Sequence, residues 1–446
     1  MTIDNTSVKL GAKPAMERAI GATNVSDVVE GRAVDGVFPK VVATPNSVDE
    51  LASVMRSAHQ SGLAVAPWGG GTRIDLGNAI SRLDVVVDLT CLNDVVQHNA
   101  ADLTVTVEAG ITLSVLRRTL AAHGQFLALD AAMPDEATIG GILASGAGGP
   151  LKWQHGSPRD QVIGMKVVQA DGRVVKSGGQ VVKNVSGYDM AKLHIGSIGT
   201  LGVIAEVSFK LTPLPRQEST ILAAFDSAQA GHSTAMAIFN SDVMPLSLTA
   251  FDANANRLGE VVDVQGASFL AIRLGGRPRT LARFERETLK LCNHGGPLSV
   301  EKIDGVNAGD LWRKLTDFGW RRDLRPAITA RVAVLPTRVV DVAGDIGETE
   351  ELDVAVVSQT GYGMSQVCWF GDPNAAPGLA RKVLERARDA VRKLEGTLIV
   401  ERCPVETKAD FDVWDDGGGP MKIMRGLKEQ YDPRGIINPG RFIGRI

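Results

Sequence analysis

Clusters of glycine between residues 67 and 202 constrain the fold of this chain more than any other feature. The first cluster, PWGGGTR at 67–73, places three glycines after a predicted strand over 63–67. Glycine loses more backbone freedom on folding than any other residue, so such a cluster needs a structural reason. For the triplet alone, a tight surface turn and a loop that holds a ligand are equally good explanations.

The chemistry of the triplet points to phosphate binding of an unusual kind. It lacks the Gly-Lys-Ser/Thr of a Walker A loop, and it is not the GxGxxG fingerprint that opens a crossover helix. Successive free backbone N–H groups can instead form a concave nest for phosphate oxygens. Thr72 adds a hydroxyl donor to this loop.

Two further clusters follow, AAMPDEATIGGILASGAGG at 131–149 and VVKNVSGYDMAKLHIGSIGTLGVI at 181–204. Three clusters in order are difficult to attribute to turns, and they favour backbone packed along an extended ligand. The candidate ligand contacts are Thr138, Gly140, Gly141, Ser145, Gly146 and Gly148 in the second cluster, and Lys183, Asn184, Tyr188, Asp189 and Gly199 in the third.

Composition limits the class of protein. The chain has 446 residues, 44% hydrophobic and 22% charged, with a net charge of −3. This length predicts two or three domains, and the scattered lysines and arginines give no reason to expect a nucleic-acid partner. The N-terminus has no secretory signal, and no apolar run approaches the roughly 20 residues of a membrane span. We expect a cytoplasmic protein without a direct membrane span, leaving open attachment at the inner membrane through partners.

The pattern of helices and strands predicts an α+β fold. Ser47 and Glu50 have capping-box spacing at the start of a helix that Gly62 ends, and Asp171-Gly172 is the turn of a predicted hairpin. Pro213 and Pro215 stop the last strand of the first half and mark a domain boundary. Beyond it, strands and single helices predict a second antiparallel α+β domain that is ferredoxin-like, with a duplicated unit as one interpretation.

The three glycine clusters together resemble the FAD-binding domain of the vanillyl-alcohol oxidase/p-cresol methylhydroxylase (PCMH-type) superfamily. The resemblance covers about 40–215 and returns at LKEQYDPRGIINPGRF. It implies four regions: an N-terminal extension at 1–39, the FAD-binding domain at 40–215, a cap or substrate domain at 216–410, and a segment at 411–446 that returns to the FAD domain.

The resemblance also implies which residues contact FAD. Trp68 to Arg73 would surround the pyrophosphate, and the second cluster would line the ribityl chain and the ring. Covalent relatives often carry a histidine after the first glycine loop, where this chain has Thr72 and Arg73, so we expect non-covalent FAD. The full expected set is Pro67, Trp68, Gly69, Gly70, Gly71, Thr72, Arg73, Pro134, Asp135, Thr138, Gly141, Ser145, Gly146, Gly148, Tyr188, Gly199, Val203 and Ile204.

Within the superfamily, VVKNVSGYDMAKL and INPGRF are similar to bacterial glycolate oxidase subunits, in particular the E-type FAD-binding subunit. This resemblance implies 2-hydroxyacid oxidation in a complex, with a catalytic flavoprotein and an iron–sulfur subunit as partners. The four cysteines are far apart and lack iron–sulfur spacing, so we expect free thiols and an electron acceptor outside this chain.

The substrate site departs from related D-2-hydroxyacid dehydrogenases. Their His-x-x-Asp-Gly-Asn and Glu-His-Gly motifs bind a divalent metal, whereas here the corresponding stretches are SQTGYGMSQVCWFG and TLIVERCPVE, and all seven histidines precede residue 295. We therefore expect no metal site of this kind. Arg331, on a buried-looking strand, is our first candidate for an anion contact.

Other candidates for catalysis have equally good structural explanations. Arg322, with Arg321 and Arg325, could clamp a carboxylate or form a solvated basic turn. His155 could face the flavin or stabilise its loop, and His194 is more typical of a core histidine. The leading hypothesis is a component of E-type glycolate oxidase character that acts on a hydroxyacid such as glycolate or lactate. The alternatives are a self-sufficient, metal-independent flavoenzyme and a catalytically silent scaffold.

Overall fold

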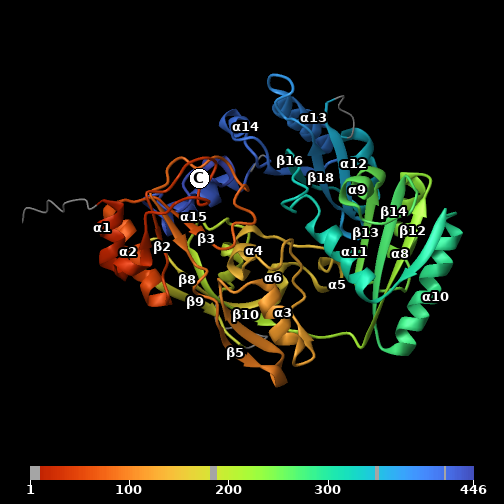
Figure 1. Cartoon of the computed structure of the whole chain (residues 1–446), viewed down its shortest axis with the longest axis horizontal. Helices are drawn as coiled ribbons and strands as arrows, with labels where there is room; N and C mark the ends of the chain where they lie inside the picture. The colour runs from red at the N-terminus through yellow and green to blue at the C-terminus, as the bar shows by residue number, and fades with distance from the viewer. Residues whose placement is uncertain (1–10, 181–187, 347–350, 416–417) are drawn as a thin grey trace, which may run out of the picture.

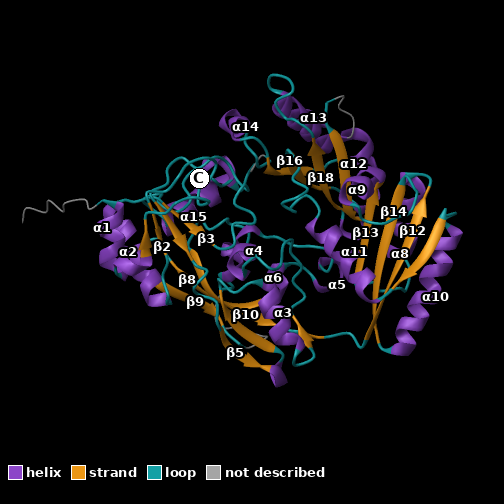
Figure 2. Cartoon of the chain, viewed as in Figure 1, coloured by secondary structure: helices purple, strands orange, loops and turns teal. Residues whose placement is uncertain are grey.

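The computed structural model describes residues 11–180, 188–346, 351–415 and 418–446. Figure 1 shows two lobes, the first in red to yellow and the second in green to blue. The end of the chain returns to the first lobe, where Val65 of β3 (Val65–Trp68) pairs with Ile437 beyond α15 (Met421–Tyr431). Helices and strands alternate in both lobes (Figure 2), which confirms the predicted α+β class.

In the described residues, the first lobe contains two larger sheets and one two-stranded pair, and the first of the larger sheets is mostly parallel. Its strand order is β1-β2-β4-β3, with β1 antiparallel at one edge. Helix α2 (Val48–Ser61) joins β2 to β3, and Ser47 Oγ accepts from the Glu50 amide at 3.1 Å, as the capping spacing predicts. The remaining elements are α1 (Ala12–Ile20), β1 (Val25–Ser26), β2 (Val41–Ala43) and β4 (Val85–Asp88).

The second sheet is antiparallel, with strand order β5-β6-β10-β8-β9. Gly172 has a φ of 83° in the turn between β8 and β9, which confirms the predicted hairpin. The strands are β5 (Val95–Asn99), β6 (Thr104–Glu108), β8 (Val162–Val168), β9 (Val174–Gly178) and β10 (Val203–Lys210); a small pair joins β7 (Gln125–Phe126) to β11 (Thr212–Pro213). The helices are α3 (Leu113–Ala121), α4 (Ile139–Ser145), α5 (Lys152–His155), α6 (Pro158–Gln161) and α7 (Ala191–His194).

The second lobe is built on one antiparallel sheet of eight strands, in the order β15-β12-β14-β13-β17-β18-β16-β19. The second half follows a β-α-β-β-α-β pattern, and the first half adds one helix between its second and third strands. The halves meet where β13 pairs with β17. The first half comprises β12 (Gln217–Phe225), α8 (Ala228–Phe239), β13 (Ser247–Asp252), α9 (Ala253–Gly259), β14 (Ser268–Gly276), α10 (Pro278–His294) and β15 (Ser299–Ile303). The second half comprises β16 (Ile328–Ala333), α12 (Val339–Ile346), β17 (Asp353–Gln359), β18 (Met364–Phe370), α13 (Leu379–Lys393) and β19 (Thr397–Arg402).

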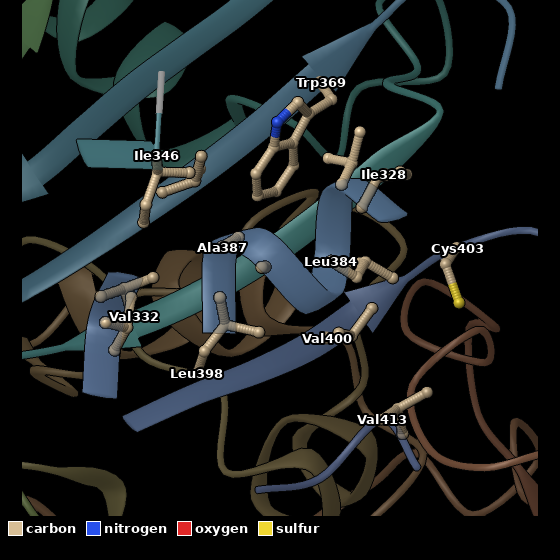
Figure 3. Close-up of a cluster of buried hydrophobic side chains, with 14 of the residues drawn as sticks. Ile328, Val332, Ile346, Trp369, Leu384, Ala387, Leu398, Val400, Cys403 and Val413 are labelled. Atoms are coloured by element: carbon tan, nitrogen blue, oxygen red, sulfur yellow. The ribbon is translucent and has the colours of Figure 1, made fainter. Parts of the chain in front are cut away.

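The two faces of this sheet have different roles. On one face, alternate side chains such as Val332 and Trp369 are buried against Leu384 of α13, in the cluster of Figure 3. Because side chains alternate along a strand, Arg331 of β16 points to the opposite face. That face is covered by α9 and α11 (Gly305–Asp317) over the middle of the sheet, and elsewhere it is turned to the first lobe. No helix in the described ranges is long and apolar enough to cross a membrane.

The returning C-terminal segment is fixed to the first lobe by a buried lysine. Lys428 of α15 donates to the Thr200 and Ile437 carbonyls, each at 2.9 Å, and pairs with Asp432 at 2.7 Å. His194 lies beside this helix with its ring centroid 5.9 Å from that of Tyr431. The His194 residue is 3% exposed, as expected for a core histidine, and burial lowers the pKa of its imidazole to about 4.

This buried imidazole predicts a pH-dependent contribution to stability. Neutral His194 is favoured in the folded protein, so its contribution is complete above the unfolded pKa near 6.5 and is lost as the pH falls towards 4. In urea unfolding, the free energy of unfolding of the wild type should fall over this pH range by up to about 3 kcal/mol more than that of His194→Leu. Burial raises the pKa of Asp252 to about 6, so the contribution of Asp252 to stability increases as the pH falls. Both proteins contain Asp252, and its effect cancels in the comparison. Parallel pH profiles for the two proteins would contradict the assignment.

Candidate functional site

Three neighbouring cavities with shared wall residues, together called the track, lead from the glycine clusters to the second lobe. The inner cavity (about 60 Å³) is bounded by Gly199, Val203 and Ile204, the loop cavity (about 90 Å³) by Gly69–Arg73, and the lobe cavity (about 110 Å³) by Gly146–Pro150 and residues of the second lobe. Thr138 lines both the inner and the loop cavities, and Arg73 lines both the loop and the lobe cavities. A ligand in this track would contact all three sequence clusters.

A larger cleft of about 700 Å³ lies between α3 and α11. Among the described residues, none of the clustered glycines of the first lobe lines it. Its Arg117 is paired with Asp130 at 3.0 Å, and its Arg273 with Glu218 at 2.8 Å. Because these charges are already balanced, we assign the candidate site to the track rather than to the larger cleft.

The first glycine loop presents free donors to the loop cavity. The amides of Gly70, Gly71, Thr72 and Arg73 donate to no carbonyl or side chain of the described residues. These four residues are half-buried and line the cavity, so their amides are available to a ligand there. Four successive free N–H groups match a ligand that carries several anionic oxygens, as a diphosphate does.

The triplet is glycine because two loops of the protein approach each other closely. A Cβ on Gly70 would overlap the Glu136 carbonyl, and a Cβ on Gly69 would overlap the Thr138 hydroxyl. Gly71 has a φ of 69°, where a side chain is strained. The reason for glycine at these positions therefore differs from the sequence interpretation. Residues of the second cluster fill the space that side chains would need, and only the backbone amides of the loop are left for a ligand.

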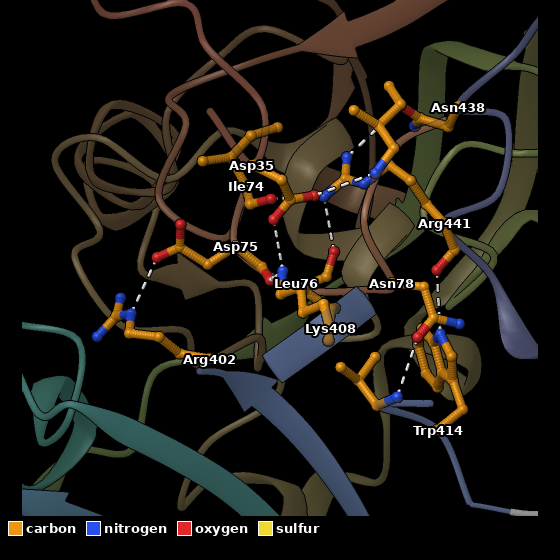
Figure 4. A network of polar contacts seen from close by, with 12 residues as sticks. Asp35, Ile74, Asp75, Leu76, Asn78, Arg402, Lys408, Trp414, Asn438 and Arg441 are labelled. Carbon is orange, nitrogen blue, oxygen red and sulfur yellow. Dashed lines mark hydrogen bonds and ion pairs between the residues drawn. The ribbon is translucent and has the colours of Figure 1, made fainter. Parts of the chain in front are cut away.

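Asn438 and Arg441, near the C-terminal end of the chain, hold this geometry in place. Asn438 Nδ2 donates to the Ile198 carbonyl at 2.7 Å, and Arg441 donates to the carbonyls of Ile74 and Leu76, which follow the glycine loop. Figure 4 shows this network, in which Lys408 also pairs with Asp35 at 2.6 Å. The buried guanidinium of Arg441 thus holds the loop and adds positive charge beside the loop cavity.

The lobe cavity has cationic walls. Arg73 Nη1 lies 3.4 Å from both carboxylate oxygens of Glu401, and Arg331 Nε lies 3.6 Å from one of them. The Arg73 guanidinium also stacks 3.8 Å from the ring centroid of Trp320. Burial lowers the pKa of Arg73, and Glu401 opposes this shift. One carboxylate therefore faces two guanidinium groups, which leaves this end of the track positively charged.

Lys152 and Tyr362 complete the lobe cavity. Lys152 Nζ lies 4.9 Å from the ring centroid of Tyr362, whose hydroxyl donates to the Gly149 carbonyl at 3.2 Å. Burial lowers the pKa of Lys152, the charge of Arg331 lowers it further, and Asp160 opposes both. Burial raises the pKa of Tyr362, so its hydroxyl stays protonated. Within the described ranges, no group of three His, Cys, Asp or Glu side chains is placed to hold a metal ion.

The structure separates the three residues expected to act in catalysis. Arg331 lines the lobe cavity. Arg322 lies at the surface, with its side chain 74% exposed, and pairs with Glu136. His155 packs its ring 5.5 Å from that of Phe126, outside the lining of the track, and burial lowers its pKa.

Most of the expected cofactor contacts line the track. These are Pro67, Trp68, Gly69, Gly70, Gly71, Thr72, Arg73, Thr138, Gly141, Ser145, Gly146, Gly148, Gly199, Val203 and Ile204. Pro134 lines the larger cleft, Asp135 is exposed, and Tyr188 is 91% exposed. Lys183 and Asn184 lie outside the described residues.

Comparison with known families also identifies an FAD-binding chain. The model of the FAD binding domain matches residues 39–178, and that of the C-terminal domain of FAD linked oxidases matches residues 214–442, just over half of the chain. Solved structures share the fold: p-cresol methylhydroxylase with substrate bound aligns with a TM-score of 0.74 at 15% identity over 96% of each chain. An alkyldihydroxyacetonephosphate synthase aligns with the same score at 16% identity, over 99% of this chain and 88% of its own.

Similar sequences cover nearly the whole chain. Glycolate oxidase subunit GlcD of Bacillus subtilis is 25% identical over 97% of both chains. D-2-hydroxyglutarate dehydrogenase of Xanthomonas citri is 27% identical, covering 91% of this chain and 89% of its own. The mitochondrial D-lactate dehydrogenase [cytochrome] of Arabidopsis thaliana is 26% identical, covering 91% of this chain and 74% of its own.

The fold and the track define an FAD-dependent oxidoreductase with a PCMH-type FAD-binding domain. The chain belongs to the family of FAD-linked oxidases. This confirms the superfamily, the two-domain fold and FAD as the cofactor. The residues fit FAD: the free amides of Gly70–Arg73 suit its diphosphate, and the small inner cavity beside Val203 and Ile204 offers apolar walls.

The close approach of the two loops predicts the effect of a minimal substitution. Gly70→Ala should lose most of its FAD, because the new Cβ would push the loop away from the Glu136 carbonyl and misplace the free amides. Flavin absorbance per protein, after acid release of the cofactor, measures occupancy. Gly426→Ala is the matched control, since a Cβ at this helical position meets no atom within 4 Å. Normal flavin content in Gly70→Ala would refute the placement of the loop.

Proposed function

We propose that this chain oxidises a small 2-hydroxy acid with FAD, and that Arg331 binds the carboxylate of the substrate. The observation that supports this most strongly is the positive lobe cavity, where Arg73 and Arg331 share the single carboxylate of Glu401. An anionic substrate would balance the remaining charge. A guanidinium pairs well with a carboxylate because two parallel N–H groups can donate to its two oxygens.

The names of similar proteins support the same substrate class. Glycolate, D-2-hydroxyglutarate and D-lactate, which appear in those names, are all 2-hydroxy acids. All carry a carboxylate next to the carbon that is oxidised. Glycolate and D-lactate are therefore the first substrates to test, and D-2-hydroxyglutarate tests whether the cavity accepts a second carboxylate.

Residues at different positions along the track would have different roles. Gly70–Arg73 would hold the diphosphate of FAD, and Gly146–Gly149 would line the flavin at the lobe cavity. Bound FAD supplies the acceptor for the two electrons removed from the substrate. Arg331 would orient the substrate through its carboxylate, and the positive wall would favour loss of the hydroxyl proton by stabilising negative charge on oxygen.

We further propose that the electrons leave through a partner, as in a multi-subunit glycolate oxidase. The sequence has no iron–sulfur cysteine spacing, and three of the four free cysteines are buried. Resemblance to the E-type subunit and similarity to GlcD both favour membership of a complex with an iron–sulfur subunit. A self-sufficient dehydrogenase differs from this only in its acceptor, whereas a silent scaffold would not reduce its flavin.

Anaerobic flavin bleaching tests this proposal directly. The purified FAD-loaded chain should lose its flavin absorbance when mixed with glycolate, D-lactate or D-2-hydroxyglutarate in the absence of partners. Retained absorbance with all three acids would contradict the proposed function and favour a scaffold. Recovery of absorbance only after an iron–sulfur partner is added would support the subunit role.

Substitution of the two candidate arginines separates their roles. Arg331→Met should weaken binding of oxalate, a non-oxidisable dicarboxylate, by about 10- to 100-fold, the range expected for loss of a charged hydrogen-bonding partner. Arg322→Met is the matched control, because this exposed arginine pairs with Glu136 at the surface. Oxalate affinity can be followed through the flavin spectrum. A larger loss in Arg322→Met than in Arg331→Met would reverse the assignment.

A further inference from the structure

Lys152 differs from the buried lysines Lys408 and Lys428 because it has no counterion among the described residues. Lys408 is paired with Asp35 at 2.6 Å, and Lys428 with Asp432 at 2.7 Å. Lys152, which is half-buried and lines the lobe cavity, has no ion-pair partner within the described ranges. Its Nζ instead lies against the ring of Tyr362. An amine without a counterion in such a place is poised to lose its proton.

The charge balance of the lobe cavity leads to the same residue. Among the groups that line the cavity, Arg73, Arg331 and Lys152 face one carboxylate, that of Glu401, and a bound substrate would add one more negative charge. Asp160 lies outside this lining and accepts from the Ser157 amide. Of the charges that line the cavity, one cation would therefore still be unbalanced. Because a guanidinium does not deprotonate in proteins, Lys152 is the group that can become neutral.

Other lining groups are poor proton acceptors. Tyr362 stays protonated, since burial raises its pKa and its hydroxyl donates to Gly149. Glu401 is engaged by Arg73 and Arg331. Among the described residues that line this cavity there is no imidazole, and Lys152 is the only amine.

The helix that carries Lys152 is fixed between the lobes. A Cβ on Gly361 of the second lobe would overlap the indole of Trp153, so glycine at this position makes room for that ring. The same indole packs 5.3 Å from Phe239 of α8, centroid to centroid. The backbone of Lys152 is therefore held by contacts with the second lobe, and its side chain lines the same cavity as Arg331.

We propose that Lys152 is the proton acceptor for the oxidation, an inference that rests on the proposed function. In this step the C2–H bond of the hydroxy acid breaks and its hydride is transferred to FAD. The hydroxyl proton passes to Lys152 Nζ, which becomes an ammonium, and the C2–O bond becomes a carbonyl. The products are a 2-oxo acid and two-electron-reduced FAD, which the external acceptor reoxidises.

This role sets the direction of the pH dependence. Five groups face Lys152 from the surrounding elements, namely Arg331, Arg73, Tyr362, Glu401 and Asp160. Because burial and Arg331 lower the pKa of Lys152, the neutral amine is available at lower pH than in an exposed lysine. The rate of flavin reduction should rise with pH until Lys152 is neutral, and Arg331→Met should move this rise to higher pH.

Two substitutions test the role by anaerobic stopped-flow reduction of the FAD-loaded chain with D-lactate, glycolate and D-2-hydroxyglutarate. Lys152→Arg keeps the positive charge but removes the proton acceptor, and Lys152→Met removes both. General-base loss should slow flavin reduction by about 100-fold or more in both variants. Lys152→Arg should retain oxalate binding, as a purely electrostatic role of Lys152 would also predict. Slow flavin reduction in this variant is predicted only if Lys152 accepts the proton. Wild-type reduction rates in Lys152→Arg would overturn the inference.

A second measurement does not depend on turnover. Competitive labelling of the FAD-loaded chain with acetic anhydride from about pH 6 to about pH 11, followed by mass spectrometry, reports where each amine loses its proton. Lys152 should become reactive at lower pH than the exposed Lys290 of the same chain. Equal midpoints would overturn the inference. If no hydroxy acid reduces the wild-type flavin, the proposed function is wrong. If the wild type is reduced and Lys152→Arg is reduced equally fast, only the assignment of Lys152 as the base is wrong.

Discussion

The close packing of the first glycine loop against the second determines the geometry of the whole site. Gly69 and Gly70 leave no room for side chains because Thr138 and the Glu136 carbonyl occupy that space. The loop held by this contact lines the loop cavity with the unpaired amides of Gly70–Arg73, and its Arg73 reaches Glu401 of the second lobe. The diphosphate contact and the charge of the substrate cavity thus depend on one backbone-to-backbone approach.

The second lobe places charged side chains at the site because side chains alternate between the two faces of its strands. Val332 and Val400 are buried with the helices on one face, while their neighbours Arg331 and Glu401 point to the other face and meet Arg73 there. The resulting cluster joins the two lobes and carries net positive charge. Arg73 lines both cavities and would therefore couple binding of the cofactor to binding of the proposed substrate.

Much of this could be predicted from the sequence, because local signals determine it. The cap at Ser47, the turn at Gly172 and the order of the glycine clusters depend on neighbouring residues. The sequence does not single out Lys152 or Trp320, since their importance arises only when residues from the two lobes meet. The sequence favours Arg331 over Arg322 because of its buried-looking strand, but only packing shows that Arg322 lies at the surface and Arg331 in the cavity.

We infer that FAD follows the track and that an anionic substrate binds at its cationic end. A crystal structure of the FAD-loaded chain soaked with oxalate would show both positions. We expect the diphosphate at the amides of Gly70–Arg73 and oxalate between Arg331 and Lys152. Oxalate bound instead in the larger cleft beside Arg117 and Trp312, or a flavin ring placed away from Gly146–Gly149, would contradict this inference.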